Sequence, residues 1–293
     1  MRLDIHRLSG IASIALGVGT AASAILGPLV TNVIRFHVSD NARNQLLGGE
    51  IISLCVAAPL AIGAGVLWLR QKPLAPKLAI GPALYALYAN VQFTIGPEYQ
   101  RYPGNNEYAV PLYLVLIILG WAVALRAWNE LRTEEAAMPS NWVRRGLAAL
   151  LIVLSLFFAL TWIRGIAQVI SGDHPTEYLQ DPTLFWLVRL MDLAFVIPAA
   201  LIEGVGLLRR AEWATRLGYA TTGFLTLEVA AVAGMAASML LRGDPSASRS
   251  LLIVMLAGTV MLVAAFVSLL QTGRPSTSGQ QRHLQQSTSH RAT

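Results

Sequence analysis

Ionisable side chains interrupt the long apolar stretches of this 293-residue sequence. One apolar stretch contains Arg189, Asp192 and Glu203, the next contains Glu228, and an earlier one contains Arg164. On a helix that turns by about 100° per residue, the first three fall within about 60° of arc on one face. A charge in an apolar solvent costs several kcal/mol unless it is paired or hydrated. These residues are therefore candidates for solute binding, proton movement or helix orientation.

Two interpretations of this cluster stay open. Arg189 and Asp192 are close enough in sequence to neutralise each other as a structural pair. Arg164 and Glu203 lie near enough to the ends of their stretches for the polar tips to reach the membrane surface. Glu228 instead lies in the middle of its stretch, with no charged residue within four positions. A carboxyl group there suits proton exchange, and it equally suits a neutral acid that only forms hydrogen bonds.

A second candidate site carries no formal charge. Tyr85, Tyr88 and Gln92 recur at helical spacing near the end of an apolar stretch, and residues 96–108 follow as a loop rich in tyrosine and turn-forming residues. This composition predicts either an outward-facing pocket capped by the loop or a belt of tyrosines at the membrane interface. Trp162, near the end of its own stretch, is interpreted as part of such an aromatic belt.

Several kinds of chemistry are disfavoured by what the sequence lacks. No short motif for nucleotide, calcium, zinc or serine-nucleophile chemistry occurs. All five histidines lie outside the apolar stretches, which argues against a haem held between helices, and the single cysteine excludes a disulfide framework. His174 lies among acidic residues, but their irregular spacing favours a solvated loop over a divalent-cation site. We expect no cofactor and no metal, and an enzyme is the least favoured class.

The apolar stretches themselves identify the class of protein. The chain is 55% hydrophobic and 13% charged, against roughly 25% charged in soluble domains, which excludes a soluble globular protein. A bilayer-spanning helix needs about 20 mostly apolar residues, and the first stretch is too long for a cleaved signal peptide. We predict an all-α polytopic membrane protein with eight transmembrane helices, at residues 8–34, 51–69, 78–95, 110–125, 146–170, 184–208, 217–241 and 251–270.

The basic residues predict the orientation of these helices. Fifteen of the 22 Lys and Arg residues fall on the side of the two termini, and five fall on the opposite side. Cytoplasmic loops carry the Lys and Arg excess, so we expect a plasma-membrane protein with both termini in the cytoplasm. The net charge of +6 is then an orientation signal. The expected partner is the lipid bilayer, with a small solute or a proton if the protein is a carrier, and not nucleic acid.

The sequence also matches itself at a constant offset of 139 residues. We therefore predict two tandem four-helix units in parallel orientation, residues 1–139 and 140–271, followed by a disordered cytoplasmic tail, residues 272–293. The alternative is an accidental alignment of apolar residues. The most informative matches align Pro59, Gly65 and Arg70 with Pro198, Gly204 and Arg209. These residues are expected at a helix kink, at a close contact between helices and at a helix end, respectively.

Two segments of the second half resemble known sequences. Residues 184–210, which begin Leu-Phe-Trp-Leu-Val-Arg-Leu-Met-Asp-Leu, and the later Gly-Asp-Pro-Ser-Ala-Ser segment resemble bacterial multi-span membrane proteins that are described only as hypothetical. The resemblance implies a bacterial inner membrane and carries no activity across.

Two functions fit these observations. One is a structural or regulatory membrane protein whose charged residues orient its helices. The other is a proton-coupled or small-solute carrier that uses Glu228 with Asp192 and Arg189. A continuous cavity that reaches Glu228 would favour the carrier, whereas Arg189 locked against Asp192 in dry packing would favour the structural role. The sequence leaves the oligomeric state undetermined.

Overall fold

The computed structural model describes residues 2–132 and 138–272, and within these ranges the chain forms helices and no strand. Eight helical segments are long and apolar enough to cross a membrane, which confirms the predicted all-α class and the number of spans. From residue 273 onward the predicted tail lies outside the described residues. The spans are Asp4–Leu26, Asp40–Leu69, Ala75–Ile95, Asn106–Leu131, Asn141–Ile170, Pro182–Leu208, Glu212–Leu241 and Arg249–Gln271.

Two of the spans are divided by a short wide turn, and the others are continuous. The second span consists of α2 (Asp40–Ile52), η1 (Ser53–Ala57) and α3 (Ala58–Leu69), and the sixth of α8 (Pro182–Met191), η3 (Asp192–Val196) and α9 (Ile197–Leu208). The remaining long helices are α1 (Arg2–Leu26), α4 (Ala75–Ile95), α5 (Val110–Leu131), α6 (Asn141–Ile170), α10 (Glu212–Leu241) and α11 (Arg249–Thr272), with the short η2 (Asn106–Ala109) and α7 (Thr176–Gln180) between them.

Helix α2 begins earlier than predicted. It starts at Asp40 and not at residue 51, because the Ser39 hydroxyl accepts a hydrogen bond from the Ala42 N–H at 3.1 Å and caps the helix. The extra turns bring Glu50 inside the span. Helix α1 conversely ends at Leu26 and not at residue 34, because a glycine and a proline follow it and open a turn.

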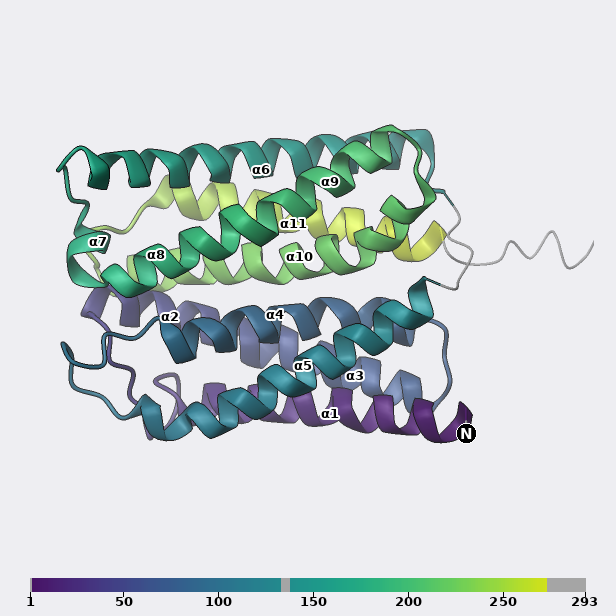
Figure 1. The fold of residues 1–293 in the computed structure, drawn as a ribbon, viewed down its shortest axis with the longest axis horizontal. Helices are drawn as coiled ribbons and strands as arrows, with labels where there is room; N and C mark the ends of the chain where they lie inside the picture. The colour runs from purple at the N-terminus through teal and green to yellow at the C-terminus, as the bar shows by residue number, and fades with distance from the viewer. Residues whose placement is uncertain (1, 133–137, 273–293) are drawn as a thin grey trace, which may run out of the picture.

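The long helices lie side by side along one direction (Figure 1). Helices α1 to α5 form one half of the molecule and α6 to α11 the other, with α1 and α6 on opposite outer edges and α4 and α10 in contact between them. The start of α1 and the end of α11 lie at the same end, which we call the terminal end. The opposite end, where α7 lies, is the distal end.

Each divided span contains one turn of π-helix, in η1 and in η3. Pro59 and Pro198 follow shortly after these turns. A proline cannot donate a backbone hydrogen bond, and its ring collides with the carbonyl group four residues earlier. A wide turn that contains this carbonyl relieves the collision. Two further features recur 139 residues apart. Helices α3 and α9 end at Leu69 and Leu208, and each is followed two residues later by a residue in the left-handed conformation, Gln71 (φ 53°) and Arg210 (φ 57°).

Helix α10 joins the two halves through two close backbone approaches. A Cβ atom on Gly48 of α2 would lie 2.1 Å from the carbonyl oxygen of Gly234, and one on Gly81 of α4 would lie 2.8 Å from the carbonyl carbon of Gly223. Approaches this short require residues without a side chain. Because lipid tails are as apolar as leucine, helices in a membrane associate largely through such close packing.

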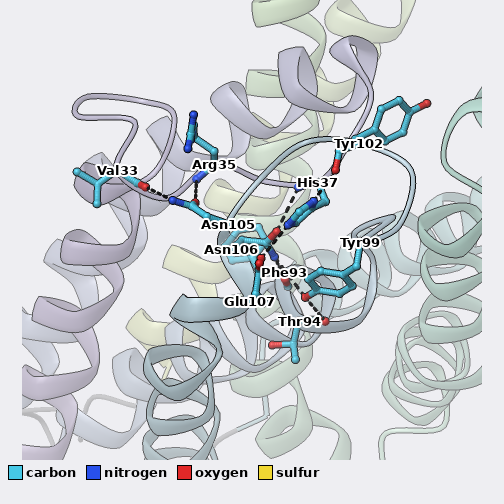
Figure 2. A network of polar contacts seen from close by, with 10 residues as sticks. All are labelled: Val33, Arg35, His37, Phe93, Thr94, Tyr99, Tyr102, Asn105, Asn106 and Glu107. Carbon is cyan, nitrogen blue, oxygen red and sulfur yellow. Dashed lines mark hydrogen bonds and ion pairs between the residues drawn. The ribbon is translucent and has the colours of Figure 1, made fainter.

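At the distal end, the loop after α1 is tied to the loop after α4 (Figure 2). The Arg35 N–H donates to the Asn105 side-chain oxygen at 2.7 Å. The His37 ring lies between two acceptors, with Nδ1 2.5 Å from the Tyr102 carbonyl oxygen and Nε2 2.7 Å from the Glu107 carboxylate. The loop that composition predicted as a cap is therefore a fixed structure, bonded to the first half.

Asn106 is the centre of this network. Its side chain is fully buried, accepts a hydrogen bond from the His37 N–H at 3.1 Å, and donates to the Phe93 carbonyl at 3.2 Å and to the Tyr99 hydroxyl at 3.3 Å. One amide thus satisfies groups from α4 and from both loops.

We predict that Gly48→Ala destabilises the protein by about 2 kcal/mol or more, because the new Cβ atom meets rigid backbone and α2 must move away from α10. The midpoint of thermal unfolding of the purified protein in detergent measures the effect. Gly63→Ala is the matched control in the same span: its Cβ atom meets nothing within 4 Å, so the midpoint should stay or rise. Equal midpoints for the two variants would contradict the role of Gly48.

We also predict that Asn106→Leu lowers stability by roughly 2–3 kcal/mol, since a side chain of similar size leaves several buried polar groups unpaired. Thermal unfolding and the rate of proteolysis in the distal loops report the change. Gln100→Ala, at an exposed position of the same loop, should change neither. Unaltered loop proteolysis in Asn106→Leu would argue against the network as the element that holds the loops.

Candidate functional site

A cavity of about 400 Å³ lies between the two halves. Helices α2, α4, α6, α8, α9 and α10 and the turn η3 provide most of its lining. The lining extends from Pro97 and Glu177 at the distal end to Leu225 and Ala200 near the middle of the spans. The Glu177 side chain is 59% exposed, so the cavity reaches the distal surface there. Six residues proposed from the sequence share this cavity: Tyr85, Tyr88, Gln92, Arg189, Asp192 and Glu228.

Tyr85 and Tyr88 face the interior of the protein. Their exposed fractions are 3% and 9%, so the interpretation of these residues as an interfacial belt is wrong. Gln92 lies one turn further toward the distal end on the same helix and lines the same cavity. The uncharged group in the first half of the chain and the charged group in the second half, both predicted from the sequence, therefore line the same cavity from opposite sides.

Asp192 binds side chains from both halves. The Tyr88 hydroxyl donates to its Oδ1 at 2.6 Å, and the Trp162 indole N–H donates to its Oδ2 at 2.8 Å. Trp162 is thus a partner of the site and not only part of an aromatic belt. Because Asp192 is the first residue of the wide turn η3, these bonds hold the turn against α4 and α6.

Arg189 pairs with Glu177, and no ion pair with Asp192 is formed among the described residues. Its Nη2 lies 3.3 Å from the Glu177 carboxylate, and its Nη1 donates to the Phe185 carbonyl at 3.0 Å. The guanidinium carbon lies 3.2 Å from the centre of the Phe185 ring and 4.7 Å from that of Trp162. The predicted pair of Arg189 with Asp192 is therefore absent. Glu177 of α7, which the sequence analysis placed among the acidic residues of a solvated loop, neutralises the guanidinium.

Glu228 differs from the other charged residues of the cavity. Its side chain is partly exposed to the cavity, and no hydrogen bond to its carboxyl group is found in the described part of the chain. Arg189 is balanced by Glu177, whereas Asp192 receives only neutral donors. Asp192 and Glu228 consequently leave the cavity with an excess of acidic groups.

Two of the predicted site residues lie elsewhere. Arg164 is exposed on α6 and does not line the cavity. Glu203 is fully buried on α9, where it neither reaches the surface nor meets the cavity, and its Oε1 accepts a hydrogen bond from the Thr222 hydroxyl at 3.1 Å. The five charges therefore form no continuous ladder through the membrane. Only Arg189, Asp192 and Glu228 belong to one site.

The sequence analysis missed Glu50, which is 1% exposed inside α2. The predicted span began just after it, and the polar residues that precede it suggested a loop. The signal that was available is the helix-capping pair Ser39 and Asp40, which starts the helix well before the apolar stretch.

We predict that the cavity admits water-soluble reagents from one face of the membrane. In a Cys55→Ala background, Gln92→Cys should react with a membrane-impermeant methanethiosulfonate added from one side only, because Gln92 lines a cavity that reaches the distal surface. Ala127→Cys, at a fully buried position outside the cavity, is the control and should stay unmodified. An unreactive Gln92→Cys would show that the cavity is closed to solvent.

The comparisons with known proteins bring no family to this site. No protein-family model matches the chain, and neither a curated protein nor a solved structure matches it significantly. The chain is shown to be a membrane protein by its eight apolar helices, and its activity has to be inferred from the cavity itself.

Proposed function

We propose that this protein is a small-solute carrier that binds its solute in the cavity between the two halves. The observation that supports this most is the cavity of about 400 Å³, which reaches from the distal surface to Glu228. Small-molecule sites are concave, largely apolar and furnished with a few polar groups, and intramembrane carboxyl groups commonly mark solute or ion paths. This cavity has that composition.

The solute best suited to the cavity is an organic cation with an apolar body. Asp192 and Glu228 supply acidic groups that form no direct ion pair among the described residues, and aromatic rings of Tyr88, Trp162 and Phe158 line the same space. Carboxylates attract a cation, and aromatic faces add a cation–π attraction of about 0.5–2 kcal/mol. The charge of Arg189, the basic residue of the cavity lining, is already balanced by Glu177, which weakens its attraction for an anionic solute.

The way the halves are joined suits a rocking motion. The close approach of Gly81 to Gly223 lies nearer to the terminal end than the cavity does. The close approach of Gly48 to Gly234 lies beside the cavity. Both involve α10, and the wide turns η1 and η3 interrupt the spans that face this helix. Wide turns are frequent at functional sites because they can shift with little cost. We propose that the halves rock about α10 to expose the solute at the terminal end.

The two halves are further proposed to be tandem units in parallel orientation, residues 1–139 and 140–271. The wide turns, helix ends and left-handed residues that recur 139 positions apart support this. We also propose the plasma membrane of a bacterium and cytoplasmic termini, on the distribution of basic residues. With that orientation, Gln92→Cys should be modified in intact cells from outside.

A structural or regulatory role is the second candidate. The bonds that Asp192 receives from Tyr88 and Trp162, and the pairing of Arg189 with Glu177, tie α8 and η3 to their neighbours. Charged residues used in this way orient helices without binding a solute. Glu228 separates the two functions, because it has no such tie.

We predict saturable uptake of radiolabelled benzyltrimethylammonium, an apolar ring with a permanent positive charge, into proteoliposomes that contain the protein. Glu228→Gln should lower uptake at least about tenfold, since the loss of one charge partner in a buried site costs 2 kcal/mol or more. Benzenesulfonate, of similar size and opposite charge, should not be taken up.

Glu203→Gln is the control, because Glu203 is a carboxyl group inside a neighbouring span that lies outside the cavity. It should leave uptake per folded protein unchanged. Saturable binding without uptake would reject a carrier and favour the regulatory role. Uptake unaffected by Glu228→Gln would reject the assigned role of Glu228.

A further inference from the structure

A second, much smaller void lies within the first half. Its volume is about 10 Å³, the size that one water molecule or one small ion fills. Four helices surround it, and Leu116 of α5 and Phe93 of α4 close it with apolar atoms. Ala86 and Ala89 also line it, together with six oxygen-bearing side chains, namely Thr20, Ser23, Glu50, Ser53, Tyr85 and Asn90.

Three of these side chains are buried with an oxygen atom that has no hydrogen-bond partner. The atoms are Ser23 Oγ, Glu50 Oε1 and Asn90 Oδ1. The exposed fractions of the three residues are 4%, 1% and 3%. The Asn90 amide nitrogen donates to the Ala86 carbonyl at 2.7 Å, whereas the side-chain oxygen has no partner in the described part of the chain. An unpaired buried polar atom costs about 1–3 kcal/mol, and three around one void indicate a ligand that contacts them together.

The chemistry of the three atoms identifies that ligand. Carboxylate, hydroxyl and amide oxygens are the donors that hard cations prefer. Glu50 lies within a membrane span, and no ion pair to it is found in the described ranges. A single carboxylate in an apolar medium is balanced by one positive charge, whereas a divalent ion would leave a net charge behind. We propose that this void is a binding site for a monovalent cation of the size of Na⁺, held by Glu50, Ser23 and Asn90.

The proposed ion site shares a wall with the large cavity. Ser53 and Tyr85 line both spaces, and the Tyr85 hydroxyl is hydrogen-bonded to the Ser53 hydroxyl at 2.9 Å. Ser53 is also the first residue of the wide turn η1. Ala89 and Phe93 line both spaces as well. If a solute occupies the large cavity, this shared wall separates it from the ion, which would couple the binding of the two. This coupling rests on the proposed function, whereas the ion site does not.

The ion site is tested on the purified full-length protein in detergent. Sodium chloride should raise the midpoint of thermal unfolding in a saturable way relative to N-methyl-D-glucamine chloride at equal ionic strength, and ²²Na⁺ should bind directly in a scintillation proximity assay. Glu50→Gln should abolish both effects. Ser23→Ala, a milder change, should raise the half-saturating sodium concentration about tenfold, the lower limit for one lost contact to a charged group.

Glu203→Gln is the control for the loss of a buried carboxyl group and should keep the sodium response. Calcium chloride should not replace sodium chloride at equal ionic strength.

Equal midpoints in the sodium and N-methyl-D-glucamine salts for the unaltered protein would overturn the proposal. So would a normal sodium response in folded Glu50→Gln, or stabilisation by low pH with no bound ²²Na⁺, which would assign the void to a proton. If Glu50→Gln does not fold, the response of Ser23→Ala decides. These sodium tests do not depend on the proposed carrier function. If the protein takes up no benzyltrimethylammonium, the sodium results still decide whether the ion site exists.

Discussion

The close approach of α10 to α2 and α4 is the constraint on which the rest of the structure depends. In water, the hydrophobic effect would hold two helical halves together, but in lipid this force is absent between helices, and close packing must replace it. The two glycine pairs, Gly48 with Gly234 and Gly81 with Gly223, allow backbone to meet backbone at either side of the molecular centre. They fix the position and the tilt of α10, and through it the relation of the two halves.

The cavity lies beside this contact, between α4 of one half and α8 of the other. The Tyr88 hydroxyl of α4 donates a hydrogen bond across this space to Asp192 of η3, and nearer the distal end a Cβ atom on Gly96 would lie 2.8 Å from the Leu184 side chain of α8. The same fold therefore makes a closed seam on one side and a cavity on the other.

The buried charges fall into two groups with different physical roles. Arg144 is 2% exposed and donates to the Leu207 carbonyl at 2.5 Å and the Leu208 carbonyl at 3.2 Å, so it satisfies the last carbonyl groups of α9. Such a residue stabilises a helix end, and nothing in its surroundings calls for a ligand. Glu228 and Glu50 have no such bonds and each lines a void. Burial alone does not separate these groups, whereas their hydrogen-bond partners and the adjoining voids do.

The sequence by itself determined the class and the number of spans, and it singled out six of the residues that line the cavity. Long apolar stretches have one stable solution in lipid, and polar residues within them stand out against that background. The sequence could not decide partners. Arg189 and Asp192 are neighbours on one helix, yet the first binds Glu177 and the second Tyr88 and Trp162, because tertiary packing brought those groups closer. Glu50 entered its span only because a capped helix begins before the apolar stretch. Helical periodicity limits which side chains share a face, but which faces meet is decided by where glycines let the helices touch.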